Sequence, residues 1–169
     1  HSYNVEVLGE IARFLSKYPL DEMDFYLVYP HGQAERNFEE VVPTLAQVRK
    51  GVEKLVAAAQ EIEIPIMILD VPLCALPESV VGHFRHRRIT HSSIATKPDG
   101  FNRNLNDWDA IRIKGPQCKE CDLKDSCGGI WSSYFRVRGA DELKPIKLHD
   151  RTAKKERNPS LYQERKARS

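Results

Sequence analysis

Hydrophobic positions in the first half of the chain repeat at helical spacing in two places. Residues 5–18 carry such a repeat, with Asn4 as the expected N-cap and Pro19 as the stop. Residues 42–60 form a longer stripe, and Pro43 is tolerated there because the first turn of a helix has no amide hydrogen bond to lose. The pattern therefore predicts two amphipathic helices, each with one buried face.

Two short apolar runs flank the second of these helices. Residues 23–29 and residues 64–71 are short, rich in apolar side chains and close to prolines, which predicts buried strands. Strand, helix and strand in succession form one βαβ unit with parallel strands. Because a helix precedes the unit, the pattern predicts a further strand before it. The first half of the chain is thus expected to be the C-terminal part of an α/β domain built from βα repeats.

The character of the sequence changes after the second strand. Residues 77–108 are irregular and polar, residues 110–113 predict a short strand, and residues 130–137 form an apolar and aromatic segment. Residues 149–169 are strongly charged, which predicts a disordered tail. We expect three parts: a βα part over residues 1–76, a cysteine-containing extension over residues 77–148, and the tail.

Composition and charge exclude some classes of function. The chain has 169 residues, of which 41% are hydrophobic, and no uninterrupted apolar stretch approaches the roughly 20 residues that cross a bilayer. Residues 151–169 of the tail carry seven basic and two acidic residues, whereas the other 150 residues carry 19 basic and 22 acidic ones. A body near neutrality argues against a dedicated nucleic-acid binder. The sequence shows no secretion signal, so we expect a cytoplasmic protein.

Four cysteines form the strongest chemical signal in the chain. Two residues separate Cys118 from Cys121, which places both thiolates on one tight turn, and Cys127 follows after five more residues. Cys74 comes just after the second predicted strand, at the edge where functional groups of α/β folds gather. Four thiolates suit either a zinc ion or an iron–sulfur cluster. The spacing leaves both open, together with the alternative of buried, unliganded thiols.

Three stretches together resemble a known family: FYLVYPHGQA at residues 25–34, EIPIMILDVPLC at residues 63–74, and the segment from the cysteine run to Pro-Ile at residues 118–146. They are similar to radical S-adenosylmethionine (SAM) enzymes that carry an auxiliary iron–sulfur cluster in a C-terminal extension of the SPASM or twitch kind. The first two stretches resemble the fifth and sixth strands of the family's partial (β/α) barrel. The third resembles the extension, and the likeness covers about residues 1–147.

The chain lacks the Cys-x3-Cys-x2-Cys motif that defines this family and binds its SAM-cleaving cluster. None of the four cysteines has that spacing. The resemblance therefore implies the C-terminal half of a radical SAM enzyme, which should not cleave SAM alone.

The family's chemistry is reductive cleavage of SAM to a radical that abstracts a substrate hydrogen, and the auxiliary [4Fe–4S] cluster binds substrate or transfers an electron. By position, the resemblance implies that the four cysteines ligate this cluster. It also implies that Leu73 lines the adenine side of the SAM pocket and that Asn4 approaches the SAM ribose or amino acid moiety. No residue receives a catalytic role. The implied partners are the missing N-terminal half of the barrel, a peptide or small-molecule substrate and a reductase.

Other notable side chains have plainer interpretations. Three histidines lie in a basic segment that we interpret as solvated surface rather than a metal site: His83, His86 and His91. Three aromatic residues are expected to shield the cluster from water: Trp131, Tyr134 and Phe135. Asp70 interrupts a buried strand, so we expect it to be ion-paired or to lie near the strand end.

Two other functions compete with the enzymatic interpretation. One is a zinc-bound structural or interaction module that uses the same four cysteines, and the identity of the bound metal distinguishes it. The other is a nucleic-acid adaptor that binds through the basic tail, and such binding would weaken steeply with salt.

Overall fold

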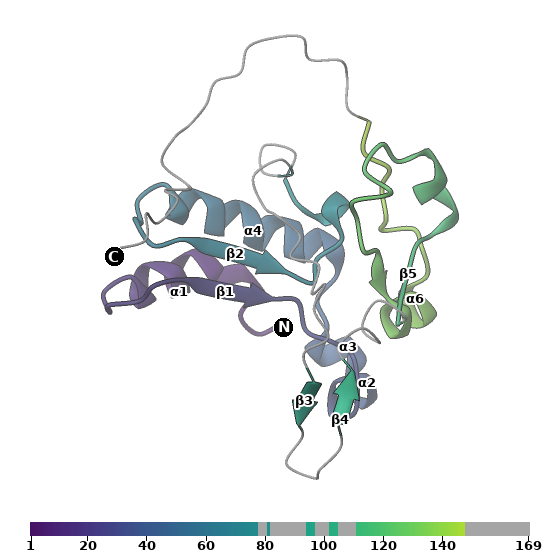
Figure 1. Ribbon diagram of the computed structural model, residues 1–169, viewed down its shortest axis with the longest axis horizontal. Helices are drawn as coiled ribbons and strands as arrows, with labels where there is room; N and C mark the ends of the chain where they lie inside the picture. The colour runs from purple at the N-terminus through teal and green to yellow at the C-terminus, as the bar shows by residue number, and fades with distance from the viewer. Residues whose placement is uncertain (78–80, 82–93, 97–101, 105–110, 148–169) are drawn as a thin grey trace.

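The structure is a computed structural model that describes residues 1–77, 81, 94–96, 102–104 and 111–147 (Figure 1). The described part contains both helices and strands, as an α/β protein should. Its first half is a βαβ unit in which β1 (Met23–Tyr26) and β2 (Ile66–Leu69) pair in parallel, with Met23 opposite Ile66. The predicted parallel pairing is confirmed. Both strands are shorter than the apolar runs that predicted them.

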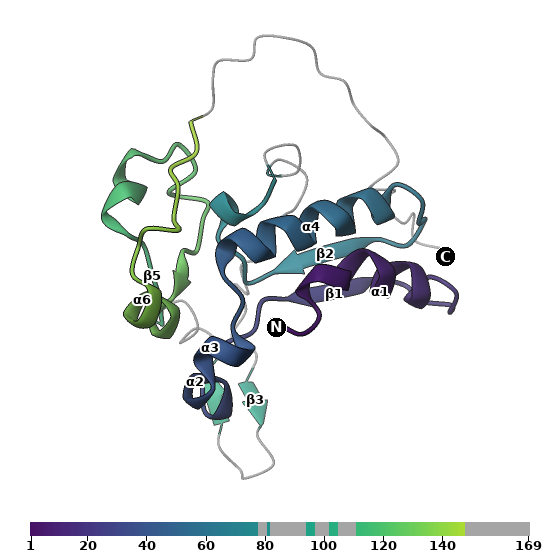
Figure 2. The ribbon, with the colours of Figure 1, turned by 180° about the vertical axis from the view of Figure 1, so that it is seen from behind.

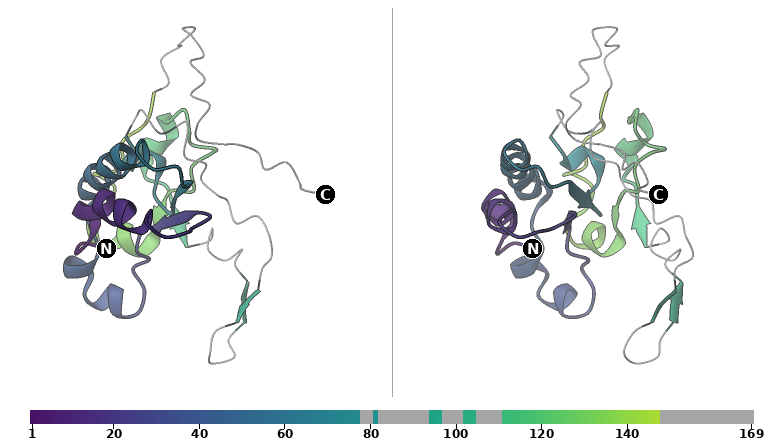
Figure 3. Two further views of the ribbon diagram at one scale, coloured as in Figure 1. Left: turned by 90° about the vertical axis from the view of Figure 1, so that its left-hand side faces the viewer. Right: turned by 60° about the vertical axis from the view of Figure 1, so that its left-hand side comes forward.

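Two helices cover one face of this parallel pair (Figure 3). They are α1 (Leu8–Leu15), which follows the 3-10 turn η1 (Val5–Val7), and α4 (Leu45–Ala59), which connects the two strands. A Cβ at Gly51 would lie 2.1 Å from the carbonyl oxygen of Val5. The backbones of η1 and α4 therefore approach so closely that only glycine fits at this crossing.

The long helix starts later than its hydrophobic stripe predicts. Thr44 is its N-cap: the Thr44 hydroxyl accepts a hydrogen bond from the Gln47 amide at 3.1 Å, and the Gln47 side chain accepts one from the Thr44 amide at 2.9 Å. This reciprocal capping box satisfies two amide donors at the helix start. Pro43 therefore precedes the cap and does not lie in the first turn, and the expected range of 42–60 shortens to Leu45–Ala59.

The start of the first helix also differs from the prediction. Asn4 precedes η1, but its side chain caps no backbone amide. Instead the Asn4 Oδ1 accepts a hydrogen bond from the terminal amine of His1 at 3.2 Å. The α-helix proper covers only Leu8–Leu15, well inside the expected range of 5–18.

The segment between β1 and α4 is helical, although its polar composition predicts a loop. It holds two short helices, α2 (Gln33–Arg36) and α3 (Phe38–Val41). Phe38 is buried and anchors α3 to the core. α2 has no buried residue, so its four residues show no apolar periodicity that would predict a helix.

The cysteine-containing extension lies beyond the carboxyl ends of β1 and β2 (Figures 1 and 2). Its strands β5 (Arg112–Ile113) and β6 (Ile130–Trp131) pair antiparallel, and between them lies the 3-10 turn η3 (Pro116–Glu120). The helix α6 (Ser132–Arg138) follows β6 directly. The sequence predicts an apolar segment here but does not separate its strand from its helix.

The expected irregular stretch of residues 77–108, at the start of the extension, contains a pair of short strands. It consists of β3 (Ile94–Thr96) and β4 (Asn102–Asn104), which pair antiparallel. The histidines of the basic segment and the charged tail of residues 149–169 lie outside the described residues.

Every sheet among the described strands has two strands, so the partial barrel stays a prediction. None of the described helices has both the length and the apolar character that crossing a bilayer requires.

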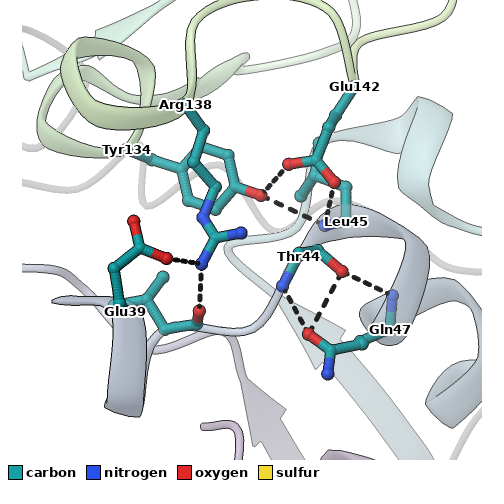
Figure 4. A network of polar contacts seen from close by, with 8 residues as sticks. Glu39, Thr44, Leu45, Gln47, Tyr134, Arg138 and Glu142 are labelled. Carbon is teal, nitrogen blue, oxygen red and sulfur yellow. Dashed lines mark hydrogen bonds and ion pairs between the residues drawn. The ribbon is translucent and has the colours of Figure 1, made fainter.

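The extension docks against the start of α4 through a polar network (Figure 4). The Tyr134 hydroxyl accepts a hydrogen bond from the Leu45 amide at 3.1 Å and donates one to the Glu142 carboxylate. The same amide donates to Glu142 at 3.1 Å. Because the first amides of a helix have no partner inside the helix, the extension supplies one here, and its carboxylate favours the positive end of the helix dipole.

Arg138 reinforces this docking from the last turn of α6. Its guanidinium donates to the Glu39 carboxylate at 2.9 Å and to the Val42 carbonyl at 3.2 Å. The same guanidinium lies over the rings of Phe38, at 5.3 Å from the centroid, and of Tyr134, at 5.8 Å. The extension is therefore attached to the βα part by charge, hydrogen bonds and cation–π contact at one place.

The close crossing at Gly51 gives a first test of the packing. We expect Gly51→Ala to lower the free energy of unfolding by about 1–3 kcal/mol, because the added methyl group overpacks the contact with Val5. At an exposed helical site the same change would raise it by about 1 kcal/mol. Urea denaturation measures the difference. Lys50→Ala, at the exposed neighbouring position, is the control and should shift stability by less than about 0.5 kcal/mol.

The docking network gives a second test through its pH dependence. Burial, together with the hydrogen bond to Glu142, raises the pKa of the Tyr134 phenol. The folded state therefore holds this proton more tightly than the unfolded state, so the network contributes fully below a pH of about 10 and is lost as the pH rises above it.

Urea denaturation between pH 8 and 11 under reducing conditions measures this effect. The parent protein should lose stability above about pH 10 more steeply than Tyr134→Phe, which removes the titrating group. Tyr18→Phe changes an exposed side chain and should keep the parent slope. Identical slopes in the parent and Tyr134→Phe would contradict the prediction.

Candidate metal centre

Cys74 lies on a turn that follows β2 directly. Asp70 is the first residue after the strand and has a positive φ of 65°, a conformation that aspartate tolerates better than most residues. The chain then continues through Pro72 into the short 3-10 turn η2 (Leu73–Ala75). Arg49 of α4 donates a hydrogen bond to the Cys74 carbonyl. The strand end and the helix behind it thus hold this cysteine at the carboxyl edge of the parallel pair.

The other three cysteines lie on one loop of the extension. In η3, the Cys121 amide donates to the Cys118 carbonyl at 3.1 Å, which is the tight turn that the Cys-x-x-Cys spacing predicts. The Cys127 amide donates to the Leu123 carbonyl at 3.0 Å and closes a second turn. Gly129 then has a φ of 85°, and a Cβ there would lie 2.3 Å from the Ile113 carbonyl oxygen. Only glycine allows the loop to return so close to β5.

Cys74 and the three-cysteine loop meet at one pocket. Besides these four cysteines, apolar residues, a glycine and lysines line it, and its volume is about 350 Å³ including the open mouth. The lining residues are Pro72, Leu73, Cys74, Lys114, Cys118, Cys121, Lys124, Cys127, Gly129, Leu143 and Lys144. The tertiary structure therefore brings the four sulfur-bearing side chains together although 44 positions separate Cys74 from Cys118.

Backbone amides point at the sulfurs from both parts of the fold. Cys127 Sγ accepts hydrogen bonds from the Leu73 amide at 3.5 Å and the Gly129 amide at 3.4 Å. Cys121 Sγ accepts one from the Ile146 amide at 3.4 Å. Amide donors favour thiolate over thiol, and hydrogen bonds to sulfur tune the potential of iron–sulfur clusters. Cys121 and Cys127 thus have backbone donors of the kind that sulfur ligands of such clusters accept.

Without a cation, the pocket disfavours four thiolates at once. Burial raises the pKa of the Cys74 thiol to about 11, a backbone hydrogen bond from Lys144 opposes the shift, and repulsion from the other three cysteines adds to it. Burial also raises the pKa of the Cys118 thiol. A bound metal centre would remove this conflict, because its positive charge stabilises every thiolate and releases the protons.

A buried ion pair joins the strand end to the extension. Arg112 of β5 forms an ion pair with Asp70, and their side chains are 6% and 23% exposed. The Arg112 guanidinium also lies 4.0 Å from the centroid of the Trp131 ring. The expectation that Asp70 is paired and lies near the strand end is confirmed. Sequence reasoning missed Arg112, although an arginine in a short apolar strand signals a buried partner.

The remaining predicted site residues separate into two groups. Leu73 is buried and lines the pocket beside Cys74, whereas Asn4 is half-buried and does not line it. Trp131 and Tyr134 are buried, but neither lines the pocket. Tyr134 contacts Leu45 and Glu142 where the extension docks, and Trp131 packs against Arg112. The proposed roles of Leu73 and Asn4 toward SAM, and of the aromatic residues as a cluster shield, stay predictions.

The donor set fits a sulfur-ligated metal centre, but the arrangement is not that of a single-ion site. In the described ranges of the chain, no group of three or more His, Cys, Asp and Glu side chains is placed so that it could hold one metal ion. The four cysteines line a shared pocket without closing on one point. Metal binding by them stays a prediction.

Comparison with protein-family models, with curated proteins and with solved structures finds no match for this chain. Interpretation of the pocket therefore depends on its own geometry and chemistry.

The buried ion pair gives a third test. Arg112→Met should lower the free energy of unfolding by about 3 kcal/mol, because it leaves the Asp70 carboxylate without its buried partner. The double variant with Asp70→Asn should cost less than the sum of the two single changes, since the second change removes the stranded charge.

Urea denaturation of this double-mutant cycle measures the coupling. Arg136→Met is the matched control, because Arg136 pairs with Glu35 at the surface with 68% of its side chain exposed. It should change stability by no more than about 1 kcal/mol. Strict additivity of the Arg112 and Asp70 variants would mean that their pairing does not tie the strand end to the extension.

Proposed function

We propose that this chain is the C-terminal part of a radical SAM enzyme and that its four cysteines hold an auxiliary [4Fe–4S] cluster. The observation that carries the proposal is the shared pocket: a cysteine at the carboxyl edge of a parallel strand pair meets three cysteines from a downstream extension. This is the pattern that the resemblance to the SPASM or twitch kind of extension implies. The βα unit would then be the last part of a partial barrel.

The surroundings of the sulfurs support a cluster. Such clusters take four cysteine thiolates, one for each iron, and their potential depends on hydrogen bonds to sulfur and on burial. Amides from the Cys74 turn and from the extension donate to Cys127 Sγ here, so both parts of the fold would set the potential. When bound, the cluster would supply a one-electron carrier beside the barrel.

Complete ligation by cysteine favours electron transfer over direct substrate binding. A metal centre that binds substrate keeps an open coordination position, whereas four protein ligands close it. All four cysteines of the chain line the pocket, so none is needed elsewhere. We therefore assign the auxiliary cluster the role of passing electrons, and the substrate, a peptide or small molecule, would bind nearer to SAM.

SAM cleavage would require the N-terminal half of the barrel, whose three-cysteine motif this chain does not contain. Leu73 would take part in both SAM binding and cluster binding. Its side chain lines the cluster pocket, and its amide contacts Cys127 Sγ. Leu73 and Asn4 would contact SAM from the carboxyl edge of the strands. A reductase would supply the electrons.

The second candidate is a zinc-bound structural module. A single zinc ion holds its four sulfurs about 2.3 Å from one point. The described side chains do not have that placement, so zinc binding would require the Cys74 turn and the extension loop to move together. The donor set itself is compatible with zinc, so metal identity decides between the two candidates.

Anaerobic reconstitution of the full chain with iron and sulfide tests the proposal. We expect a brown protein with roughly four iron and four sulfide per chain, and an EPR signal of a reduced cluster after reduction. Cys74→Ala and Cys121→Ala should each lower the iron content to below about half of the parent value, because each removes one ligand. Ser126→Ala, an exposed change on the same loop, should keep it.

Two results would reject the proposal. One is a colourless protein that binds one zinc ion per chain and gains no iron. The other is unchanged iron content in Cys74→Ala together with a loss in Cys121→Ala, which would mean that the cysteine of the βα part is not a ligand. The second result would leave a three-cysteine site confined to the extension.

A further inference from the structure

We propose that three lysines around the mouth of the cysteine pocket form a docking surface for a small acidic electron-transfer protein that exchanges electrons with the auxiliary cluster. The lysines are Lys114, Lys124 and Lys144. This inference rests on the proposed function and deepens it, because it names the place and the chemistry of the redox partner.

Apart from the cysteines, the ionisable side chains that line the pocket are all lysines, which are positively charged. All three lysines are exposed, and no aspartate or glutamate lines this pocket in the described part of the chain. They come from different segments: Lys114 follows β5, Lys124 lies between Cys121 and Cys127, and Lys144 follows α6. Folding therefore gathers three positive charges around one opening, although they are scattered along the chain.

The lysines differ in what their ammonium groups do. Lys114 Nζ donates to the Lys124 carbonyl and fixes the cysteine loop against β5. The other two have no ion pair among the described residues. By contrast, Arg112, Arg136 and Arg138 of the described extension each pair with a carboxylate. Lys124 and Lys144 thus remain available to an external anion.

The pocket mouth is also where an electron would enter or leave. A cluster ligated by all four cysteines reacts by outer-sphere electron transfer, so the partner must come close to it without binding iron. Cys118 and Cys127 are only partly buried, so this side of the pocket is open to solvent. In the transfer one electron leaves the reduced partner and enters the cluster, and no bond forms or breaks.

An electron-transfer protein fits a small charged rim better than other partners do. Redox encounters use small, weak interfaces, and complementary charge gives them fast association. Opposite charges steer the two proteins together and raise the association rate by roughly 10-fold or more at low salt. Three exposed lysines on a pocket lining that has no carboxylate among the described residues provide that complementarity to a carboxylate-rich surface.

The experiment uses the reconstituted full chain and a reduced plant-type [2Fe–2S] ferredoxin as the acidic probe. Affinity is measured by fluorescence titration, and the rate of electron transfer by anaerobic stopped flow, both as a function of ionic strength. The test variant is Lys124→Gln/Lys144→Gln. Lys114 is left in place because it supports the loop. The control variant Lys17→Gln/Lys50→Gln makes the same change in net charge away from the pocket.

We expect the test variant to bind ferredoxin about 10-fold more weakly at low salt and to lose much of the salt dependence. The control variant should stay within about 2-fold of the parent. Reduction by a cationic viologen should not slow in either variant, because this reagent does not need the lysines. A slower reaction with viologen would mean that the substitutions damaged the centre.

Different results would overturn the cluster and the lysine docking surface. A chain that gains no iron overturns the proposed function. An iron-loaded chain whose two variants bind ferredoxin equally well overturns the docking surface alone. Binding of glutarate that depends on Lys124 and Lys144, without any binding of ferredoxin, would assign the rim to a small anionic ligand and would also overturn the proposal.

Discussion

The docking of the extension onto the βα unit is the constraint on which the candidate site depends. Cys74 belongs to the turn after β2, whereas the other three cysteines belong to a loop more than forty positions downstream. The extension that carries them is held to the βα part by the Arg112–Asp70 pair at the strand end, by Tyr134 and Glu142 at the start of α4, and by a shared hydrophobic core. Each contact is buried or partly buried, so losing one partner is costly.

The same docking brings four ionisable thiols close together and places backbone amides beside their sulfurs. Bringing four cysteines together raises the pKa of Cys74 through burial and mutual repulsion. A backbone hydrogen bond from Lys144 opposes that shift at Cys74, and the amides of Leu73, Gly129 and Ile146 donate hydrogen bonds to the sulfurs of Cys127 and Cys121. The structure thus prepares a place for thiolates that becomes fully favourable only with a positive centre. That balance is typical of metal sites whose binding is coupled to deprotonation and folding.

Electrostatics also separates the roles of the basic residues in the extension. Arg112 and Arg138 are largely buried in ion pairs and cation–π contacts, where a planar guanidinium makes several contacts at once. The lysines at the pocket are exposed instead. Arginines hold the site together, and lysines present charge at its opening. This division would suit the docking role that we propose for the lysines.

Sequence patterning alone determined the parallel βαβ unit, because strand and helix periodicities depend on local alternation of apolar and polar residues. It also determined the tight turn of the Cys-x-x-Cys pair. It missed the helices between β1 and α4, because α2 has no buried residue and α3 has one, Phe38, so neither shows a hydrophobic periodicity. It placed the start of α4 too early, because the reciprocal Thr44–Gln47 bonds override the hydrophobic stripe.

Only the tertiary structure decided which distant residues meet. That Cys74 shares a pocket with the extension, that Arg112 is the partner of Asp70, and that three scattered lysines surround one opening all depend on long-range packing. The resemblance implied the first of these meetings, but local periodicity and spacing indicate none of them, because their free energy comes from contacts that exist only after the two parts of the fold have docked. The sequence by itself determined the ligand types and the local turns, and the docked fold decided that they form one site.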